Sequence, residues 1–480
     1  MHGVLVEGDA APKVSFTSQD FLGLGSDAAV KLQARETLER YTVGSCGPRG
    51  FYGTTRKHLE LEDDIAAFMR KDQSITYSDA TATIASAIPA FAKRGDVLLV
   101  DARANYGIMA GARLSRSSIV KFRHNDLEDL RNKLLEVRSA DERASGTAAQ
   151  SLALSTRRFI VVEGLYANTG DLCPLDAVEA LAREFKWRII VDDSWGFGVL
   201  GPTGRGITEH FGSAREGREG RELLHVEVLV GSLSTTLASV GGFCVGSREV
   251  VDHQRLSGQG YCFSASAPPF TCATAAAALA AMAATGGAAA SVVGAGRRVG
   301  GPELLARLRA KSELAQRELA TALGGRMRLT SDPISPIKHL VLLPGPDGPL
   351  LSPAASLLAG SSGSLSPAGR RQPLRAAGAA AVRASAPLTM RPSKHQLERE
   401  AARERAREER LLDRIVLEAC ARGVLVSRSH GMSADAAAAP SLRIMVTVLH
   451  TEEDLRALAR TLKAAVGAVL DADAGALPKA

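Results

Sequence analysis

Three short aliphatic runs in this sequence each end at an acidic residue. The acids, with the runs that precede them, are Asp101 after residues 97–100, Glu163 after 159–162 and Asp192 after 189–191. The runs are rich in β-branched residues, which is typical of strands buried on both faces of a parallel sheet. Ligands of such sheets bind at the carboxyl ends of the strands, so these carboxylates lie where a protein binds a polar ligand. For Asp192 the alternative is a structural role as the cap of the next element.

The segments between these runs carry apolar residues at helical spacing, as in residues 59–70. A fourth run, residues 226–230, ends at Gly231, and helical patterns usually follow the runs. This alternation predicts an α/β fold with a mostly parallel sheet. The C-terminal elements that we expect are a charged helix over residues 393–422, a strand over 442–449 and a helix that opens at Thr451.

The length of 480 residues is comfortable for two domains. We predict an N-terminal arm at residues 1–45, a large domain at 46–290 and a smaller C-terminal α/β domain at 291–480. The first twelve residues of the arm are expected to be untethered. Two segments of low complexity, 139–156 and 345–392, interrupt the pattern, and the second is expected to be a disordered surface insertion.

The composition argues against several classes of protein. The net charge of +7, from 59 basic and 52 acidic residues, is modest, and the basic segments lack the interleaved aromatic residues of a nucleic-acid site. The six cysteines form no CxxC pair and show no zinc-ligand spacing, so we predict no metal site. One uncharged run, residues 256–296, is long enough to span a membrane. Because it is mostly alanine, a buried, closely packed helix is the interpretation that we favour.

Several motifs of the chain resemble those of the α-oxoamine synthases. They are residues 46–54 (Cys-Gly-Pro-Arg-Gly-Phe-Tyr-Gly-Thr) with His58 shortly after, residues 161–166 (Val-Val-Glu-Gly-Leu-Tyr) and residues 252–264. Members of that family are fold-type I, pyridoxal-phosphate-dependent acyltransferases that condense an amino acid with an acyl-CoA. The resemblance extends from about Val14 to about Leu462, apart from the two low-complexity segments. It implies the fold-type I architecture, with a large domain and a smaller C-terminal α/β domain.

The catalytic lysine of that family is absent where the resemblance places it. Residues 231–242 (Gly-Ser-Leu-Ser-Thr-Thr-Leu-Ala-Ser-Val-Gly-Gly) resemble the lysine loop, but Thr235 occupies the lysine position. No lysine occurs anywhere between Lys186 and Lys311. A hydroxyl group cannot form the Schiff base that holds the cofactor aldehyde and later accepts the substrate proton. The resemblance therefore implies a chain that has lost its own catalytic chemistry.

Other cofactor contacts of the family are altered as well. Asp192 matches the carboxylate that faces the pyridine nitrogen of the cofactor. Trp195 replaces the histidine that bonds the phenolic oxygen, and Asn105 replaces the histidine that stacks on the ring. In the phosphate turn, residues 78–83, Asp79 adds a negative charge where the free amides of a helix N-terminus would bind the phosphate.

Residues that match the family's contacts to the partner subunit and to the substrate are retained. Ser264 and Ser266 match the loop that reaches the partner's cofactor phosphate, although a simple turn before a helix is the alternative. His58 lies in a motif near the subunit interface, where it would approach the substrate or serve as a satisfied structural histidine. Arg443 matches the arginine that grips the amino-acid carboxylate in a bidentate pair, and a structural salt bridge is the alternative.

The resemblance implies a function as the non-catalytic subunit of a serine C-palmitoyltransferase. The lysine-bearing partner would hold the pyridoxal phosphate and condense L-serine with palmitoyl-CoA to 3-oxosphinganine. This chain would stabilise the partner and complete its pocket. The resemblance also implies the cytosolic face of the endoplasmic reticulum membrane and small regulatory membrane subunits. Such subunits usually carry an N-terminal membrane helix that is not visible here, so the partner supplies the anchor or the sequence is truncated.

Two alternatives remain open from the sequence. One is an active homodimeric α-oxoamine synthase that uses a displaced lysine, such as Lys338. The other is a regulatory binding protein outside the sphingolipid pathway. Co-purification with a second, lysine-bearing homologue separates this last alternative from the subunit.

Overall fold

The computed structural model describes residues 3–4, 12–143, 155–213, 223–286, 291–293, 297–343, 394–429 and 439–475. The insertion that we predict at 345–392 lies outside the described residues, as does most of the predicted segment at 139–156. What we predict for these residues therefore stays a prediction.

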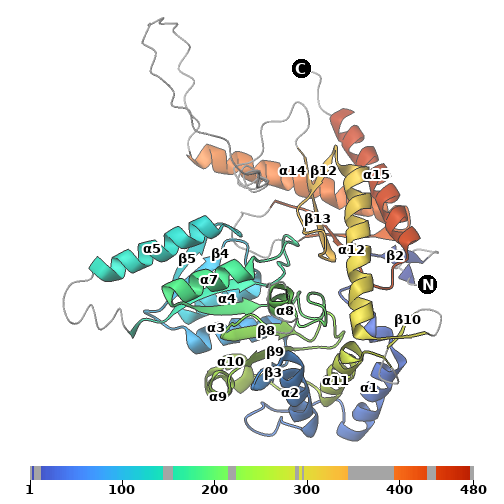
Figure 1. Ribbon diagram of the computed structural model, residues 1–480. Coiled ribbons are helices and arrows are strands. Elements are labelled where there is room, and N and C mark those ends of the chain that lie inside the picture. Colours follow the sequence, from blue (N-terminus) through green and yellow to red (C-terminus); the bar gives the residue numbers. More distant parts are fainter. Residues whose placement is uncertain are drawn as a thin grey trace, which may run out of the picture.

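A seven-stranded sheet forms the centre of the larger α/β part of the molecule (Figure 1). In order across the sheet, its strands are β3 (Gln73–Tyr77), β9 (Gly242–Gly246), β8 (Val228–Ser232), β7 (Arg188–Asp192), β6 (Arg158–Glu163), β4 (Val97–Asp101) and β5 (Ser118–Phe122). Strand β9 alone runs opposite to the other six strands, which confirms the predicted mostly parallel sheet. The three acids at the ends of the aliphatic runs are the last residues of β4, β6 and β7. The fourth run starts its strand two residues later than predicted, at Val228.

Alternate residues of the central strands contact helices on opposite faces of the sheet. On one face, Leu98 and Val100 of β4 share a core with α3 (Ala80–Phe91), α4 (Tyr106–Ser115), α9 (Arg248–Ser257) and α10 (Gln259–Cys262). On the other, Leu99 shares a core with α1 (Ala28–Tyr41), α2 (Arg56–Met69), α5 (Leu127–Arg143), α7 (Leu175–Phe185), α8 (Ile207–Gly212) and α11 (Pro269–Ala283). Burial on both faces is the reason why the strand sequences are continuously apolar.

The long uncharged run of the sequence contains α11. This helix packs against both α1 and α2, and its Ala275 and Ala278 are fully buried. The prediction of a buried, closely packed helix is therefore confirmed. Within the described stretches of the chain, no helix is both long and apolar enough to cross a membrane.

A second core surrounds an antiparallel sheet of four strands. In order they are β12 (Met327–Leu329), β13 (Ile337–Leu342), β16 (Leu442–Met445) and β15 (Ser427–Arg428). Three long helices pack on this sheet, namely α12 (Gly301–Leu323), α14 (Lys394–Ala421) and α15 (Glu452–Gly475) (Figure 1). The predicted charged helix and the helix after Thr451 are confirmed as α14 and α15, whereas β16 is four residues shorter than the predicted strand.

The two cores are joined by α12 and by the N-terminal segment. The first half of α12 contributes Leu304 to the core of the seven-stranded sheet, and its second half contributes Leu319 to the second core.

A 3-10 helix, η1 (Leu24–Ser26), precedes α1, and a hairpin of β10 (Ser291–Val293) and β11 (Arg297–Val299) precedes α12. Near the N-terminus, β2 (Lys13–Ser15) pairs with β1 (Gly3–Val4) and with β14 (Val424–Leu425). The first residues are thus not untethered throughout, because β1 is paired. The domain limits that we predict stay a prediction.

One histidine bridges two carboxylates at the end of β4. His124 Nδ1 lies 2.8 Å from Asp101 Oδ1, and Nε2 lies 2.9 Å from Asp171 Oδ2. Burial by itself lowers the pKa of His124, but the charges and hydrogen bonds of Asp101 and Asp171 raise it to about 10. The imidazolium therefore ties the segment after β5 to the end of β4 and to the loop after β6.

We expect this cluster to make the fold less stable in alkaline solution. The pKa of His124 in the folded chain exceeds the value of about 6.5 for an unfolded histidine. Its contribution to stability is therefore complete below about pH 6.5 and is lost as the pH rises toward about 10. Urea unfolding of the wild type and of His124→Gln should show a difference in unfolding free energy that shrinks over this range. A difference that stays constant with pH would contradict the assignment.

Candidate functional site

The carboxyl ends of β6 and β7 place two buried carboxyl groups beside each other. The register pairs Glu163 with Asp192, and both side chains are almost fully removed from solvent. Asp192 Oδ1 accepts hydrogen bonds from the backbone N–H and the hydroxyl of Ser194, at 3.1 and 2.6 Å. Asp192 Oδ2 accepts a hydrogen bond from the side-chain amide of Asn105 at 2.8 Å. The carboxyl group that the resemblance assigns to a cofactor nitrogen is thus bonded to groups of its own chain.

Asn105 connects both carboxyl groups to α4. Its backbone N–H donates to Glu163 Oε1 at 2.8 Å, while its side-chain oxygen accepts from the N–H of Ile108 at 3.0 Å as the N-cap of α4. Burial, and after it the charge of Asp192, raise the pKa of Glu163 to about 8. Burial also raises the pKa of Asp192. At neutral pH the pair therefore carries fewer than two negative charges.

The side chain at the lysine position is hydrogen-bonded inside the same group of residues. Thr235 is buried, and its hydroxyl donates to the backbone oxygen of Ser194 at 3.0 Å. Trp195 is partly buried, and its ring meets Phe21 edge-on with the ring centroids 6.2 Å apart. Its indole N–H is only a donor, so it cannot replace a histidine as an acceptor. The structure therefore brings Asn105 and Thr235 into one hydrogen-bonded group with Asp192 and Ser194, whereas the ring of Trp195 contacts Phe21.

The phosphate turn is capped by a carboxylate of the chain. Asp79 Oδ1 accepts a hydrogen bond from the backbone N–H of Ala82 at 2.7 Å, which makes Asp79 the N-cap of α3. An amide that would bind a phosphate is thereby occupied by an acid. The residues present do not fit pyridoxal phosphate, because the amine is missing, the pyridine-facing carboxylate is already bonded and the phosphate turn carries a negative charge.

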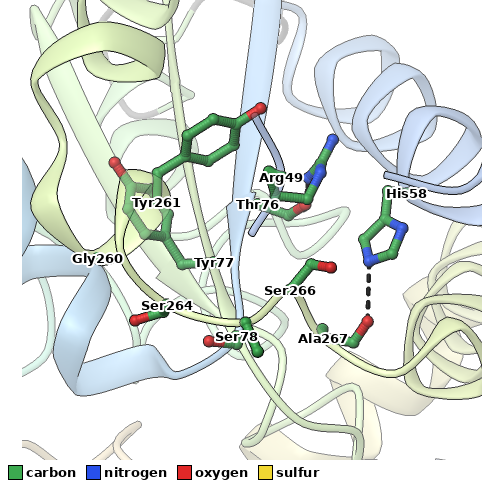
Figure 2. A pocket seen from close by; sticks show the side chains of 11 residues that line it. Arg49, His58, Thr76, Tyr77, Ser78, Gly260, Tyr261, Ser264, Ser266 and Ala267 are labelled. Carbon is green, nitrogen blue, oxygen red and sulfur yellow. Dashed lines mark hydrogen bonds between the residues drawn. The ribbon is translucent and has the colours of Figure 1, made fainter. Parts of the chain in front are cut away.

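A small pocket is lined in part by residues of two loops that the resemblance places near a partner subunit (Figure 2). We call residues 46–54 the glycine loop and residues 261–267 the serine loop. Ser264 is partly buried, and within the described residues its hydroxyl has no hydrogen-bond partner, so its contact with a partner's phosphate stays a prediction. The Ser266 hydroxyl is buried and lies 2.5 Å from Gly53 O and 3.1 Å from Gly47 O. Its single proton is used within the chain, which favours the alternative of a turn before a helix, and a contact of Ser266 with a partner's phosphate stays a prediction.

His58 has a structural role. Its Nδ1 accepts a hydrogen bond from the backbone N–H of Thr55 at 3.1 Å, in a capping box that begins α2. Its Nε2 lies 2.9 Å from Ala267 O, and Figure 2 shows the ring directed at this carbonyl. Burial, followed by the positive charge of Arg49, lowers the pKa of His58, so the ring is neutral at pH 7. Because both ring nitrogens are engaged, the contacts favour the structural alternative for His58, and a contact with the substrate stays a prediction.

The buried side chain of Arg49 connects the glycine loop to α2, to β3 and to the serine loop. Its guanidinium donates to both carboxylate oxygens of Glu62, at 2.7 and 2.9 Å, and to the hydroxyl of Thr76 at 2.9 Å. It also lies 5.4 Å from the ring centroid of Tyr261, at the start of the serine loop. With the hydrogen bonds described above, this network fixes the glycine loop against the serine loop.

Arg443 and Lys338 lie on the neighbouring strands β16 and β13. Arg443 Nε is buried without a hydrogen-bond partner, and no carboxylate of the described residues pairs with this guanidinium. The salt-bridge alternative is thus not found there, and carboxylate binding stays a prediction. Lys338 is fully buried, and its Nζ donates to the backbone oxygens of Asp332 and Pro333 at 3.0 and 2.9 Å. Burial lowers its pKa to about 7, but a buried, bonded amine cannot reach a cofactor, so the structure does not support a displaced lysine.

Two residue pairs in this site cannot be predicted from the sequence. The position of Glu163 at a strand end is visible in the sequence, but its proximity to Asp192 depends on β6 and β7 being neighbours. The pairing of Arg49 with Glu62 has no signal in spacing, because it joins a loop to a helix. The one hint for the first pair is that strands consecutive in the sequence often lie side by side in a sheet.

The sheet order, the flanking helices and the second α/β core define the fold-type I architecture of pyridoxal-phosphate-dependent transferases. A serine palmitoyltransferase from Sphingomonas wittichii shares this fold with a TM-score of 0.69 and 21% identity, over 98% of this chain and 90% of that chain. An 8-amino-7-oxononanoate synthase from Francisella tularensis shares it with a TM-score of 0.61 and 16% identity, over 95% of this chain and 98% of that one. The chain belongs to the aminotransferase class I and II family, whose sequence model matches residues 11–289.

Curated relatives agree with the resemblance seen in the motifs. The chain is 39% identical over 333 residues to "Serine palmitoyltransferase 1" of Dictyostelium discoideum, a match that covers 69% of this chain and 62% of the relative. It is 37% identical over 334 residues to "Long chain base biosynthesis protein 1b" of Oryza sativa subsp. japonica, over 70% of this chain and 62% of the relative. The chain thus spans less than two thirds of the length of these relatives. The predicted resemblance is confirmed.

Proposed function

We propose that this chain is the non-catalytic subunit of a serine palmitoyltransferase. Its partner bears the lysine and holds the pyridoxal phosphate, and the complex condenses L-serine with palmitoyl-CoA to 3-oxosphinganine, CoA and CO2. The observation that carries the proposal is Thr235, because a hydroxyl bonded to Ser194 O stands where the reaction requires an amine. The names of the relatives support the choice of reaction.

Exposed aromatic residues on the two loops support a partner subunit. Phe51 and Tyr52 of the glycine loop are 74% and 93% exposed, and Phe263 of the serine loop is 84% exposed. Large aromatic side chains are enriched at protein interfaces and are costly to leave in water. Ser266 bonds the two loops to each other, and we propose that a related subunit covers these exposed side chains. Ser264 lies next to Phe263, where its unbonded hydroxyl would donate a hydrogen bond into the partner's site.

We also propose that the complex works at the cytosolic face of the endoplasmic reticulum membrane, with small membrane subunits as regulators. The product carries a long hydrocarbon chain and partitions into a bilayer, and the acyl-CoA substrate is amphipathic.

Co-expression with a lysine-bearing homologue from the same organism tests the proposed function. The two chains should co-purify, and only the complex should form 3-oxosphinganine from L-serine and palmitoyl-CoA. Replacement of the partner's lysine should abolish this activity, whereas Lys338→Met in this chain should leave it intact if the complex still assembles. Product formation by this chain alone, or failure of the two chains to associate, would count against the proposal.

A further inference from the structure

We propose that the former cofactor pocket of this chain is closed by its own side chains, so that the chain is stable without a cofactor. In this arrangement Asn105 supplies to Asp192 the hydrogen bond that a pyridinium N–H supplies in a lysine-bearing relative. The inference deepens the proposed function, because it explains how a chain that leaves the cofactor to its partner keeps a buried carboxylate satisfied.

The buried carboxyl group of Asp192 requires hydrogen-bond donors. Asp192 lies beside Glu163 at adjacent strand ends, and both are removed from water. A buried carboxylate is tolerated only when donors surround it. Ser194 supplies two donors on one oxygen, and the amide of Asn105 supplies the donor on the other. No external group is needed to complete these bonds.

Asn105 forms hydrogen bonds with several groups at once. Its backbone N–H bonds Glu163, its amide bonds Asp192, and its side-chain oxygen caps α4 through Ile108 N. An amide side chain is suited to this position because it carries a donor and an acceptor at the same end. The residue that replaces a cofactor-stacking histidine thus links the two strand ends to the helix.

The side chains at two other altered positions also form hydrogen bonds within the chain. The Thr235 hydroxyl bonds the backbone oxygen of Ser194, the residue that also bonds Asp192. At the phosphate turn, the Asp79 carboxylate bonds an N-terminal amide of α3. Asp79 is exposed to solvent, so we assign the closure mainly to Asn105 and Thr235, with Asp79 opposing an incoming phosphate by charge.

The variant Asn105→Asp tests the closure directly. Aspartate caps a helix as well as asparagine does, so a role limited to capping predicts almost no change. Closure predicts a large loss, because a third carboxyl group would replace the donor that Asp192 requires. At pH 7 the thermal midpoint of the 480-residue chain should fall by roughly 5 °C. Asn105→Ser, which keeps a cap without adding charge, should show a smaller fall and covers the case in which Asn105→Asp does not fold.

The matched control is Asn132→Asp, the same change on the exposed surface of α5, which should leave the midpoint unchanged. A second measurement adds 4-deoxypyridoxine 5′-phosphate, which has no aldehyde, to the wild-type chain. The thermal midpoint and the tryptophan fluorescence, to which Trp195 contributes, should not change at millimolar ligand. A saturable change, or an Asn105→Asp variant as stable as the wild type, would overturn the inference. An active co-purified complex with either of these outcomes would leave the proposed function standing.

Discussion

Replacement of Arg49 by methionine should lower the free energy of unfolding by about 3–5 kcal/mol. The guanidinium and the Glu62 carboxylate are joined by two hydrogen bonds, and their side chains are only 4% and 5% exposed. Removal of this cation leaves the buried carboxylate with only the more distant Arg255, 3.9 Å away and 32% exposed, as a counter-charge. Because Arg49 also bonds Thr76 and lies over Tyr261, the glycine and serine loops should lose their fixed relation. Urea unfolding and the affinity for the partner subunit measure the two consequences.

Two comparison variants separate this effect from the loss of any surface ion pair. Arg56 and Glu60 form an exposed pair on α2 at 2.9 Å, with side-chain exposures of 80% and 41%. Arg56→Met should therefore cost less than about 1 kcal/mol. In the double variant Arg49→Met with Glu62→Gln, much of the lost stability should return, because no buried charge remains. A loss in Arg49→Met as small as that in Arg56→Met would show that the buried pair does not hold the loops.

Gly206→Ala should be comparably damaging, at about 4 kcal/mol. Gly206 precedes α8 with φ +83° and ψ −156°, a conformation that only glycine adopts readily. An added Cβ would also overlap the carboxylate of Asp193, which is fully buried and accepts a hydrogen bond from Ile207 N at 2.8 Å. The carboxylate has little room to move away, because Gly164 and Gly196 pack so tightly against its other oxygen that a Cβ on either would lie 2.0 Å from Oδ1. Thermal and urea unfolding of the purified chain measure the effect.

Gly95 is the matched position for this variant. It also has a positive φ, +96°, but nothing lies within 4 Å of the place where its Cβ would be. Gly95→Ala should therefore cost only the backbone strain, roughly 1 kcal/mol. Removal of the obstructing side chain in Gly206→Ala with Asp193→Ala should recover part of the loss. Equal losses at the two glycines would show that crowding around the buried carboxylate is unimportant.

The strand-end residues of the fold follow from sequence because local pattern determines them. Each of the runs before Asp101, Glu163 and Asp192 is apolar throughout, as a strand buried on both faces requires, and each forms a strand of the parallel sheet. The limits of β16 do not follow, because Val446 and Val448 continue the apolar pattern while lying outside the strand. Because an apolar residue can be buried in a loop as well as in a strand, the apolar pattern does not mark where the strand ends.

The candidate site follows from the sequence only in part. The missing amine at Thr235 is a property of residue type and is visible directly. Hydrogen-bond partners are a property of the fold, so the contacts of His58 and Ser266 could not be predicted from the sequence. The sequence leaves an outward and a structural role open for both, and in the structure His58 bonds a carbonyl of the serine loop while Ser266 bonds carbonyls of the glycine loop. Contacts between segments more than 200 residues apart leave no trace in spacing.

The location of the Schiff base tests the central claim most directly. The co-purified complex would be reduced with borohydride, which fixes pyridoxal to the lysine that carries it, and the pyridoxyl peptide would be identified by mass spectrometry. We expect one pyridoxyl group per pair of chains, attached to the partner's lysine and to no lysine of this chain. A stoichiometric pyridoxyl group on Lys338, or on any other lysine of this chain, would contradict the account.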